Sequence, residues 1–304
     1  MRNTTTPDLS GRTMIVTGAN AGIGKETAVG LARMGATVVM TARNPAKGAE
    51  ALEEVRRRTG SRTVELGLLD LASLASVREF AQRFLSEHDR LDVLVNNAGL
   101  ITDSRTETAD GFEQMFGVNH LGHFLLTELL RDRLVASAPS RVVVVSSIAH
   151  RAAIGGLRFD DLQSERSFRS SLVYGRSKLA NLLFTLELAE QLAPEGVTVN
   201  AVHPGSINSH FGGGGDTKVL GRLISKVGRY VLRSPEVGAR ASILLASSNL
   251  PKVTDSTGAY FPKGHRRPAS RRARDVDAAR RLWAMSERLV GSASSTCQDD
   301  GQVL

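Results

Sequence analysis

The chain has 304 residues, of which 41% are hydrophobic and 23% charged, so it can bury the core of one large α/β domain. This composition excludes a fibrous or an intrinsically disordered chain. The net charge of +8 raises the question of a nucleic-acid partner, but much of the excess lies in one segment, whose basic residues are Lys263, Arg266, Arg267, Arg271, Arg272 and Arg274. We interpret this segment as a solvated surface loop and expect no nucleic-acid binding, with contact to an anionic surface as the alternative.

The N-terminal residues are polar, so we expect no signal peptide. No segment offers a charge-free apolar run of spanning length, because even residues 121–135 contain several charged side chains. Cys297 is the only cysteine and has no partner for an intrachain disulfide, which fits a reducing compartment. We therefore expect a cytoplasmic protein without a membrane span.

Short β-branched runs alternate with longer amphipathic stretches along the chain, the pattern of repeated βαβ units. Strands are expected at residues 14–17, 37–41, 63–68, 93–95, 141–146, 197–202 and 258–261. Helices are expected at residues 23–34, 45–58, 74–87, 108–135, 174–192, 235–246 and 275–290. The alternation predicts an α/β fold, a single-domain Rossmann-type doubly wound parallel sheet of about seven strands flanked by helices.

We expect the domain to span residues 1–291 and residues 292–304 to form a disordered tail. The run Gly212–Gly215 predicts a mobile loop, since four successive glycines leave the backbone unusually free.

The first chemical motif joins the opening strand to its helix and reads T-G-A-N-A-G-I-G from Thr17. Its glycines leave room for a dinucleotide pyrophosphate to approach backbone amides, and the helix start adds a positive dipole end. The predicted cofactor-binding residues here are Gly18, Asn20, Gly22, Ile23 and Gly24. The spacing G-x-x-x-G-x-G differs from the G-x-G-x-x-G fingerprint, so a plain tight turn is the alternative.

The end of the second strand discriminates between the two nicotinamide cofactors. An acidic residue there would accept hydrogen bonds from the ribose 2′-hydroxyl of NAD, but this chain has Arg43 followed by Asn44. Arg43, together with Lys47, is suited to the 2′-phosphate of NADP, because a planar guanidinium matches phosphate oxygens. We therefore favour NADP(H) over NAD(H). The alternative is that Arg43 is an ordinary surface residue that follows a strand.

Two further loops follow strands at the edge where ligands of open α/β sheets collect. Asp70 and Leu71 follow the third strand, and Asn97, Ala98 and Gly99 follow the fourth. We expect both loops to line an adenosine pocket. Either could equally be a simple turn, since Asn, Asp and Gly favour turns for local reasons.

The catalytic pattern combines a serine at a strand end with a Tyr-x-x-x-Lys helix. Ser147 follows the fifth strand, and Tyr174 and Lys178 share one helix face because they are four residues apart. A lysine ammonium stabilises a nearby phenolate, so we expect the pKa of Tyr174 to be lowered from about 10 and the phenol to act as general acid/base. Ser147 would hydrogen-bond the reacting carbonyl. Alone, the Tyr-x-x-x-Lys spacing is often structural.

Residues 12 to about 290 resemble the short-chain dehydrogenase/reductase family through T-G-x-x-x-G-I-G, N-N-A-G and Y-x-x-x-K in this order. The strings V-N-H-L-G-H-F from Val118, V-S-S-I-A-H from Val145, S-K-L-A-N from Ser177 and R-L-W from Arg281 resemble its retinol dehydrogenase-like and WW-domain-oxidoreductase-like branch. The resemblance implies catalytic roles for Asn119, Ser147, Tyr174 and Lys178. Asn119 would hold a proton-relay water, and Lys178 would also grip the nicotinamide ribose.

The resemblance further implies a nicotinamide contact after the sixth strand, at Pro204, Gly205, Ile207 and Ser209, where Ser209 stands in for the family's usual threonine. The substrate lid is expected at about residues 205–232. No metal is implied, and we consider His120-x-x-His123 a poor metal site because no other ligand joins the two histidines in the sequence.

The implied activity is hydride transfer between NADP(H) and a small-molecule alcohol or carbonyl substrate of lipophilic character. The branch's membrane-anchoring segment is not seen in the chain, so retinoids do not follow as substrates. A homodimer or homotetramer is implied, formed by the helix after residue 108 and the helix of Tyr174. The alternatives are a non-catalytic NADP-binding regulator and an epimerase or dehydratase using the same Tyr-Lys pair.

Overall fold

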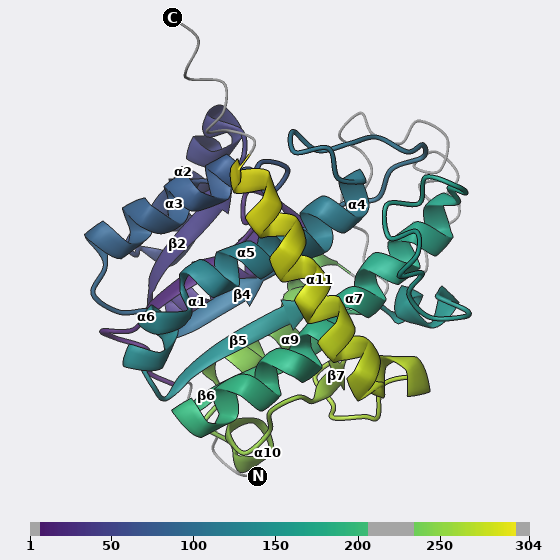
Figure 1. Cartoon of the computed structure of the whole chain (residues 1–304). Helices are drawn as coiled ribbons and strands as arrows, with labels where there is room; N and C mark the ends of the chain where they lie inside the picture. The colour runs from purple at the N-terminus through teal and green to yellow at the C-terminus, as the bar shows by residue number, and fades with distance from the viewer. Residues whose placement is uncertain (1–6, 206–233, 296–304) are drawn as a thin grey trace, which may run out of the picture.

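The computed structural model describes residues 7–205 and 234–295, and its centre is a seven-stranded sheet (Figure 1). The strands are β1 (Thr13–Val16), β2 (Thr37–Ala42), β3 (Val64–Leu68), β4 (Val93–Asn96), β5 (Ser140–Val145), β6 (Val197–His203) and β7 (Tyr260–Pro262). They run parallel in the order β3-β2-β1-β4-β5-β6-β7. The predicted fold class is confirmed, and the order reverses between β1 and β4, where a crevice opens at the carboxyl ends of the strands.

Helices cover both faces of the sheet. One face carries α1 (Gly22–Arg33), α2 (Pro45–Thr59), α9 (Pro235–Ser247) and the short α10 (Pro251–Thr254), whose apolar residues join one core cluster. The other carries α3 (Leu74–Glu87), α5 (Gly122–Leu129), α7 (Ser170–Leu192) and α11 (Val276–Ser295), which share a second cluster. The apolar strands lie between the two cores, as their near-continuous hydrophobic runs predicted.

The predicted helix over residues 108–135 was wrong in its start and its continuity. Thr108 belongs to a turn, and the helix begins as α4 (Gln114–Phe116), because the buried Glu113 carboxylate accepts hydrogen bonds from the first backbone amides of α4. The chain then widens into a π-turn, η1 (Gly117–Leu121), before α5 and a separate α6 (Arg131–Ala136). The π-turn contains Asn119.

Two other boundaries differ from expectation. α7 begins at Ser170, so Tyr174 lies in the second turn of that helix and does not open it. α11 continues to Ser295, into the segment expected as a tail.

The expected lid and the Gly212–Gly215 run lie almost entirely within residues 206–233, outside the described residues. Short 3-10 turns, η2 (Ile148–Ala152), η3 (Ala193–Glu195) and η5 (Arg271–Arg274), complete the connections.

The C-terminal helix α11 packs across α5 and α7, as Figure 1 shows in yellow. Its Trp283 ring lies 4.9 Å from the Phe124 ring of α5 and 5.9 Å from the Phe184 ring of α7, measured between centroids. These are the two helices expected to pair between subunits. Part of the surface of these two helices is thus covered by α11 of the same chain, and the expected homo-oligomer stays a prediction.

Within residues 7–205 and 234–295, no helix combines the length and the apolar character that crossing a membrane requires.

Replacing Trp283 with alanine should lower the free energy of unfolding by about 3–5 kcal/mol, because the ring is buried between two phenylalanines. Chemical denaturation measures the change. Val276→Ala, at an exposed position of the same helix, is the matched control and should change it by less than about 0.5 kcal/mol. Equal stability of the Trp283 variant and the wild-type protein would contradict the packing described.

Candidate functional site

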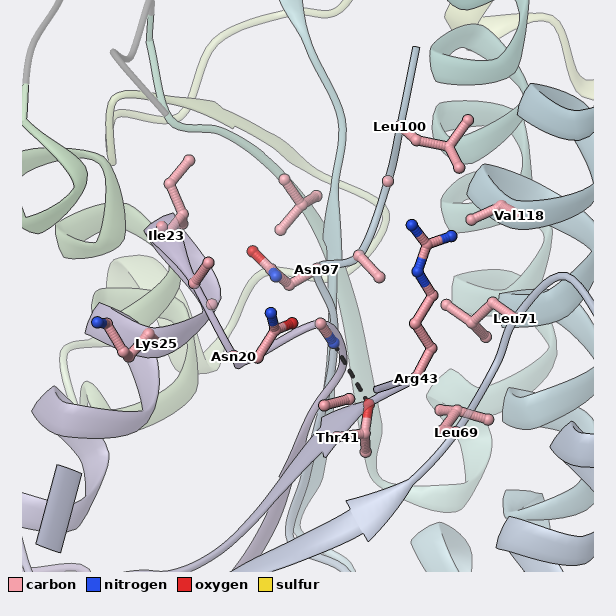
Figure 2. A pocket seen from close by; sticks show the side chains of 18 of the residues that line it. Asn20, Ile23, Lys25, Thr41, Arg43, Leu69, Leu71, Asn97, Leu100 and Val118 are labelled. Carbon is pink, nitrogen blue, oxygen red and sulfur yellow. Dashed lines mark hydrogen bonds between the residues drawn. The ribbon is translucent and has the colours of Figure 1, made fainter. Parts of the chain in front are cut away.

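A cavity of about 860 Å³ lies at the carboxyl ends of the strands, at the crevice between β1 and β4 (Figure 2). Its walls come from the loops after β1, β2, β3, β4, β5 and β6 and from the start of α7. The cavity collects these predicted residues: Gly18, Asn20, Gly22, Ile23, Gly24, Arg43, Asn44, Lys47, Asp70, Leu71, Asn97, Ala98, Gly99, Ser147, Tyr174, Lys178, Pro204 and Gly205. Residues remote in the sequence thus form a single site.

The loop after β1 is held against the loop after β4. The Asn97 amide donates to the Thr17 carbonyl at 2.7 Å, and the Thr17 hydroxyl accepts from the backbone amides of Asn97 and Ala98 at 2.8 and 2.9 Å. Gly18 has φ of 63°, and a Cβ there would lie 2.9 Å from the Ala98 Cβ. Only glycine fits this position, both for its backbone angle and for its close packing.

The first turn of α1 is free to meet an anion. No side chain caps its N-terminus, and its first turn contains no acidic residue. The unpaired N–H groups and the positive dipole end of this helix border the cavity at Gly22, Ile23 and Gly24. A diphosphate fits this donor set.

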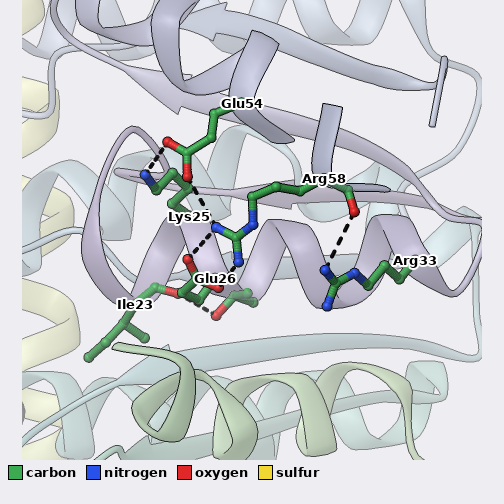
Figure 3. A network of polar contacts seen from close by, with 7 residues as sticks. Ile23, Lys25, Glu26, Arg33, Glu54 and Arg58 are labelled. Carbon is green, nitrogen blue, oxygen red and sulfur yellow. Dashed lines mark hydrogen bonds and ion pairs between the residues drawn. The ribbon is translucent and has the colours of Figure 1, made fainter. Parts of the chain in front are cut away.

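The charged rim of the cavity divides into paired and unpaired cations. Lys25 lines the cavity but forms an ion pair with Glu54 at 2.5 Å (Figure 3). Arg43 and Lys47 are exposed and have no carboxylate partner within the described part of the chain. In Figure 2 the Arg43 side chain extends from the end of β2 and lies on the same side of the cavity as Leu69 and Leu71. These two cations are therefore available to an anionic ligand.

The pairing of Lys25 belongs to a larger network that fixes α2 against α1 (Figure 3). The Arg58 guanidinium donates to both carboxylate oxygens of the buried Glu26 at 2.7 Å, and to Glu54 at 3.2 Å. Its partners raise the pKa of Arg58, the hydrogen bond to Glu26 most of all. This bidentate geometry makes one wall of the cavity rigid.

Tyr174, Lys178 and Ser147 line the opposite end of the cavity. The Lys178 ammonium is buried, donates to the Val145 carbonyl at 3.1 Å, and lies 5.9 Å from the centre of the Tyr174 ring. Gly99 makes room for it, since a Cβ at that position would lie 3.1 Å from Lys178 Nζ. Burial lowers the pKa of Lys178 to about 8.

The expected lowering of the Tyr174 pKa is not found. Burial raises the pKa of Tyr174 to about 12, and a hydrogen bond from Ser147 only partly offsets this effect. Desolvation of the ring raises the pKa of Tyr174 more than the hydrogen bond with Ser147 lowers it. The Lys178 ammonium, expected to lower this pKa, donates to the Val145 carbonyl. At neutral pH Tyr174 is thus a protonated phenol, a form suited to giving up a proton.

Asn119 does not line the cavity, unlike the other three predicted catalytic residues. It is fully buried, and its side-chain oxygen accepts from the Leu100 amide at 2.8 Å. Its amide nitrogen donates to the Leu100 carbonyl at 3.0 Å and to the Ser177 hydroxyl at 2.9 Å. Asn119 therefore connects the loop after β4 with α7, and both of its amide hydrogens are used within the protein.

Two predicted residues have additional local roles. The Asn44 side chain caps α2 by accepting from the Lys47 amide at 3.0 Å, and the Asp70 carboxylate accepts from the Ala72 amide at 2.9 Å.

Ile207 and Ser209 lie outside the described residues. Among the residues of the cavity wall that prediction from the sequence missed are Lys25, Leu100, Ile101, Val118 and His203. Leu100, Ile101 and His203 follow or end predicted strands, which is the signal that could have located them.

Comparison with known proteins agrees with this geometry. The family model described as short chain dehydrogenase matches residues 12–158 and 162–216. Human (Homo sapiens) retinol dehydrogenase 13 is 45% identical over 288 residues, covering 93% of this chain and 86% of the relative. Retinol dehydrogenase 12 of Mus musculus is 46% identical over 288 residues, covering 95% and 89%.

Solved structures share the fold over most of its length. An uncharacterized protein from Mycobacterium Paratuberculosis has a TM-score of 0.73 and 38% identity, covering 94% of this chain and 96% of that one. The Pseudomonas aeruginosa RhlG/NADP active-site complex has a TM-score of 0.65 and 27% identity, covering 84% and 95%. With the matched family model and the identity to the retinol dehydrogenases, these findings show that the chain belongs to the short-chain dehydrogenase/reductase family of oxidoreductases.

Proposed function

We propose that the protein transfers a hydride between NADP(H) and a lipophilic alcohol or carbonyl compound, with Tyr174 as the general acid/base. The observation that carries the proposal is the cavity itself, which has two unpaired cations, Arg43 and Lys47, at one end and Tyr174 beside the buried Lys178 at the other. The relatives named as retinol dehydrogenases and the structure named as an NADP complex support it.

The described residues fit NADP(H) along the whole cavity. Arg43 and Lys47 would bind the 2′-phosphate, the start of α1 with Gly18 would hold the diphosphate, and Lys178 would contact the nicotinamide ribose. When bound, the cofactor supplies or accepts the hydride. Lys25 takes no part in phosphate binding in this proposal, because Glu54 holds it.

In the direction of carbonyl reduction, the substrate oxygen lies against the hydroxyls of Tyr174 and Ser147. Ser147 donates a hydrogen bond that polarises the carbonyl, while Tyr174 transfers its proton to the oxygen as negative charge develops there. The transfer leaves a phenolate, which the nearby Lys178 ammonium stabilises. Lys178 thus acts on the charged form of Tyr174, whereas burial of the ring dominates the pKa of Tyr174 before the proton is transferred.

The character of the substrate follows from the cavity wall near Tyr174. Leu100, Ile101 and Pro204 contribute apolar side chains to the cavity, and such surfaces favour alkyl or polyene groups over sugars. We therefore propose lipophilic alcohols, aldehydes or ketones as the substrate class.

Replacing Tyr174 with phenylalanine should lower kcat for carbonyl reduction by about 10²–10⁴-fold, because the variant has no proton to donate. A screen of NADPH consumption over aliphatic and aromatic aldehydes and ketones, paired with NADP⁺ reduction over alcohols, measures it. NADPH binding, followed by fluorescence, should persist in the variant. The matched control is Tyr260→Phe, at a buried tyrosine outside the cavity. Wild-type protein that binds NADPH but turns over nothing would favour a regulator and contradict the proposal.

Replacing Arg43 with alanine should raise the Kd for NADPH about 10- to 100-fold and leave the Kd for NADH almost unchanged, since only NADPH carries the 2′-phosphate. Titration of cofactor fluorescence measures both constants. Arg57→Ala, at an exposed arginine of α2 outside the cavity, is the control. Tighter binding of NADH than NADPH by the wild-type protein would show that the cofactor assignment is wrong.

Replacing Lys178 with methionine should reduce kcat/KM about 100-fold but raise the free energy of unfolding at pH 7 by about 2 kcal/mol. Burial lowers the pKa of Lys178 from 10.5 to about 8, so its charged form opposes folding at pH 7. The unfolded chain binds more protons than the folded one between these two values, and wild-type stability therefore rises with pH there. The advantage of the variant should shrink from pH 8 to pH 10.5 in chemical denaturation. Lys252→Met, at an exposed lysine outside the cavity, is the control. A destabilised Lys178 variant at pH 7 would contradict the expectation.

A further inference from the structure

His120 and His123 lie one helical turn apart and are both buried, yet they have separate partners. His120 Nε2 lies 2.8 Å from the Ser286 hydroxyl of α11. His123 Nδ1 lies 3.2 Å from the Asn119 carbonyl oxygen, and its Nε2 lies 2.9 Å from the Thr17 hydroxyl. Burial lowers the pKa of each ring to about 3, so both are neutral at physiological pH.

The partners of His123 determine which of its nitrogens carries the hydrogen. A carbonyl oxygen only accepts, so the contact with Asn119 places the hydrogen on Nδ1. Nε2 is then an acceptor, and the Thr17 hydroxyl donates to it. The opposite tautomer, with the hydrogen on Nε2, would need a free lone pair on the Thr17 hydroxyl oxygen. Both lone pairs of that oxygen already accept hydrogen bonds, from the backbone amides of Asn97 and Ala98. The Thr17 hydroxyl could also donate to the Val95 carbonyl oxygen, but that distance is 3.3 Å. The distance from the hydroxyl to His123 Nε2 is shorter, 2.9 Å, which favours the bond to His123.

This tautomer completes a chain of hydrogen bonds across the site. On one side, Thr17 holds the loop after β1 to the loop after β4. On the other, the Asn119 side chain donates to the Ser177 hydroxyl, which donates to the Tyr174 carbonyl at 2.8 Å. His123 connects these two halves, from the residue before Gly18 to the helix of Tyr174.

We propose that His123 is a positioning residue, whose Nδ1–H tautomer holds Thr17 and Asn119 at the separation that aligns the nucleotide-binding turn with Tyr174. His123 does not line the cavity and acts through these two residues. The inference rests on the proposed function, because alignment matters only if the cofactor lies between Gly18 and Tyr174. A small displacement of one half against the other is costly for hydride transfer, which requires the reacting atoms in contact.

The first test compares His123→Leu with His120→Leu, which removes an equally buried histidine from the same segment. His123→Leu should raise the Kd for NADPH and lower kcat at saturating NADPH, each about tenfold. His120→Leu should lower the melting temperature but keep both values within about twofold of wild type. His123→Gln, which can still accept from Thr17, should recover part of the NADPH affinity. Equal Kd and kcat for the two leucine variants would overturn the proposal.

The second test needs no turnover. In a double-mutant cycle of Thr17→Val and His123→Leu, the free energies of unfolding of the cofactor-free proteins should be non-additive, because each substitution removes the same hydrogen bond. Additive effects would refute the bond and with it the proposal. Wild-type protein that neither binds NADPH nor reduces any carbonyl would instead refute the proposed function. A coupled cycle with wild-type cofactor affinity in His123→Leu would also count against the positioning role.

Discussion

The buried ammonium of Lys178 is the constraint on which much of the site depends. The ammonium donates to the Val145 carbonyl, and its burial costs free energy because it is removed from water. Gly99 leaves room for it, because a Cβ at that position would lie 3.1 Å from Lys178 Nζ and 3.2 Å from the Asn119 side-chain oxygen. A site built in this way is less stable than an apolar one would be, which is typical of residues held for function.

The two ends of the cavity are fixed by different means. At the end near α2, charges neutralise one another in the network of Lys25, Glu26, Glu54 and Arg58, so the wall keeps its shape without a ligand. Arg43 stands outside that network, so its charge is available to an anionic ligand. At the end near α7, neutral hydrogen bonds through Thr17, His123 and Asn119 take the place of ion pairs. Such bonds between neutral groups fix the positions of these residues and place no further ionic charge beside the Lys178 ammonium.

Most of the cavity could be predicted because its residues follow strands whose buried, β-branched runs are legible in the sequence. Gly18, Asn97 and Ser147 each follow such a run, and all three line the cavity. The parts that could not be predicted depend on tertiary contacts. The buried Glu113 carboxylate decides where α4 begins, and the burial of Tyr174 reverses the expected direction of its pKa. The partners of His123 come from segments far away in the sequence, which spacing along one helix cannot reveal.

α11 covers part of α5 and α7, the two helices expected at the subunit interface. α5 and α7 carry apolar side chains that need cover, and another subunit is only one way to provide it. Here the rings of Trp283, Phe124 and Phe184 pack together within one chain, and the hydroxyl of Ser286, on the same helix as Trp283, lies 2.8 Å from Nε2 of His120 in the π-turn. The helix of Tyr174 is thus supported on its outer side by α11 and on its inner side by Asn119. Both of these supports are intramolecular.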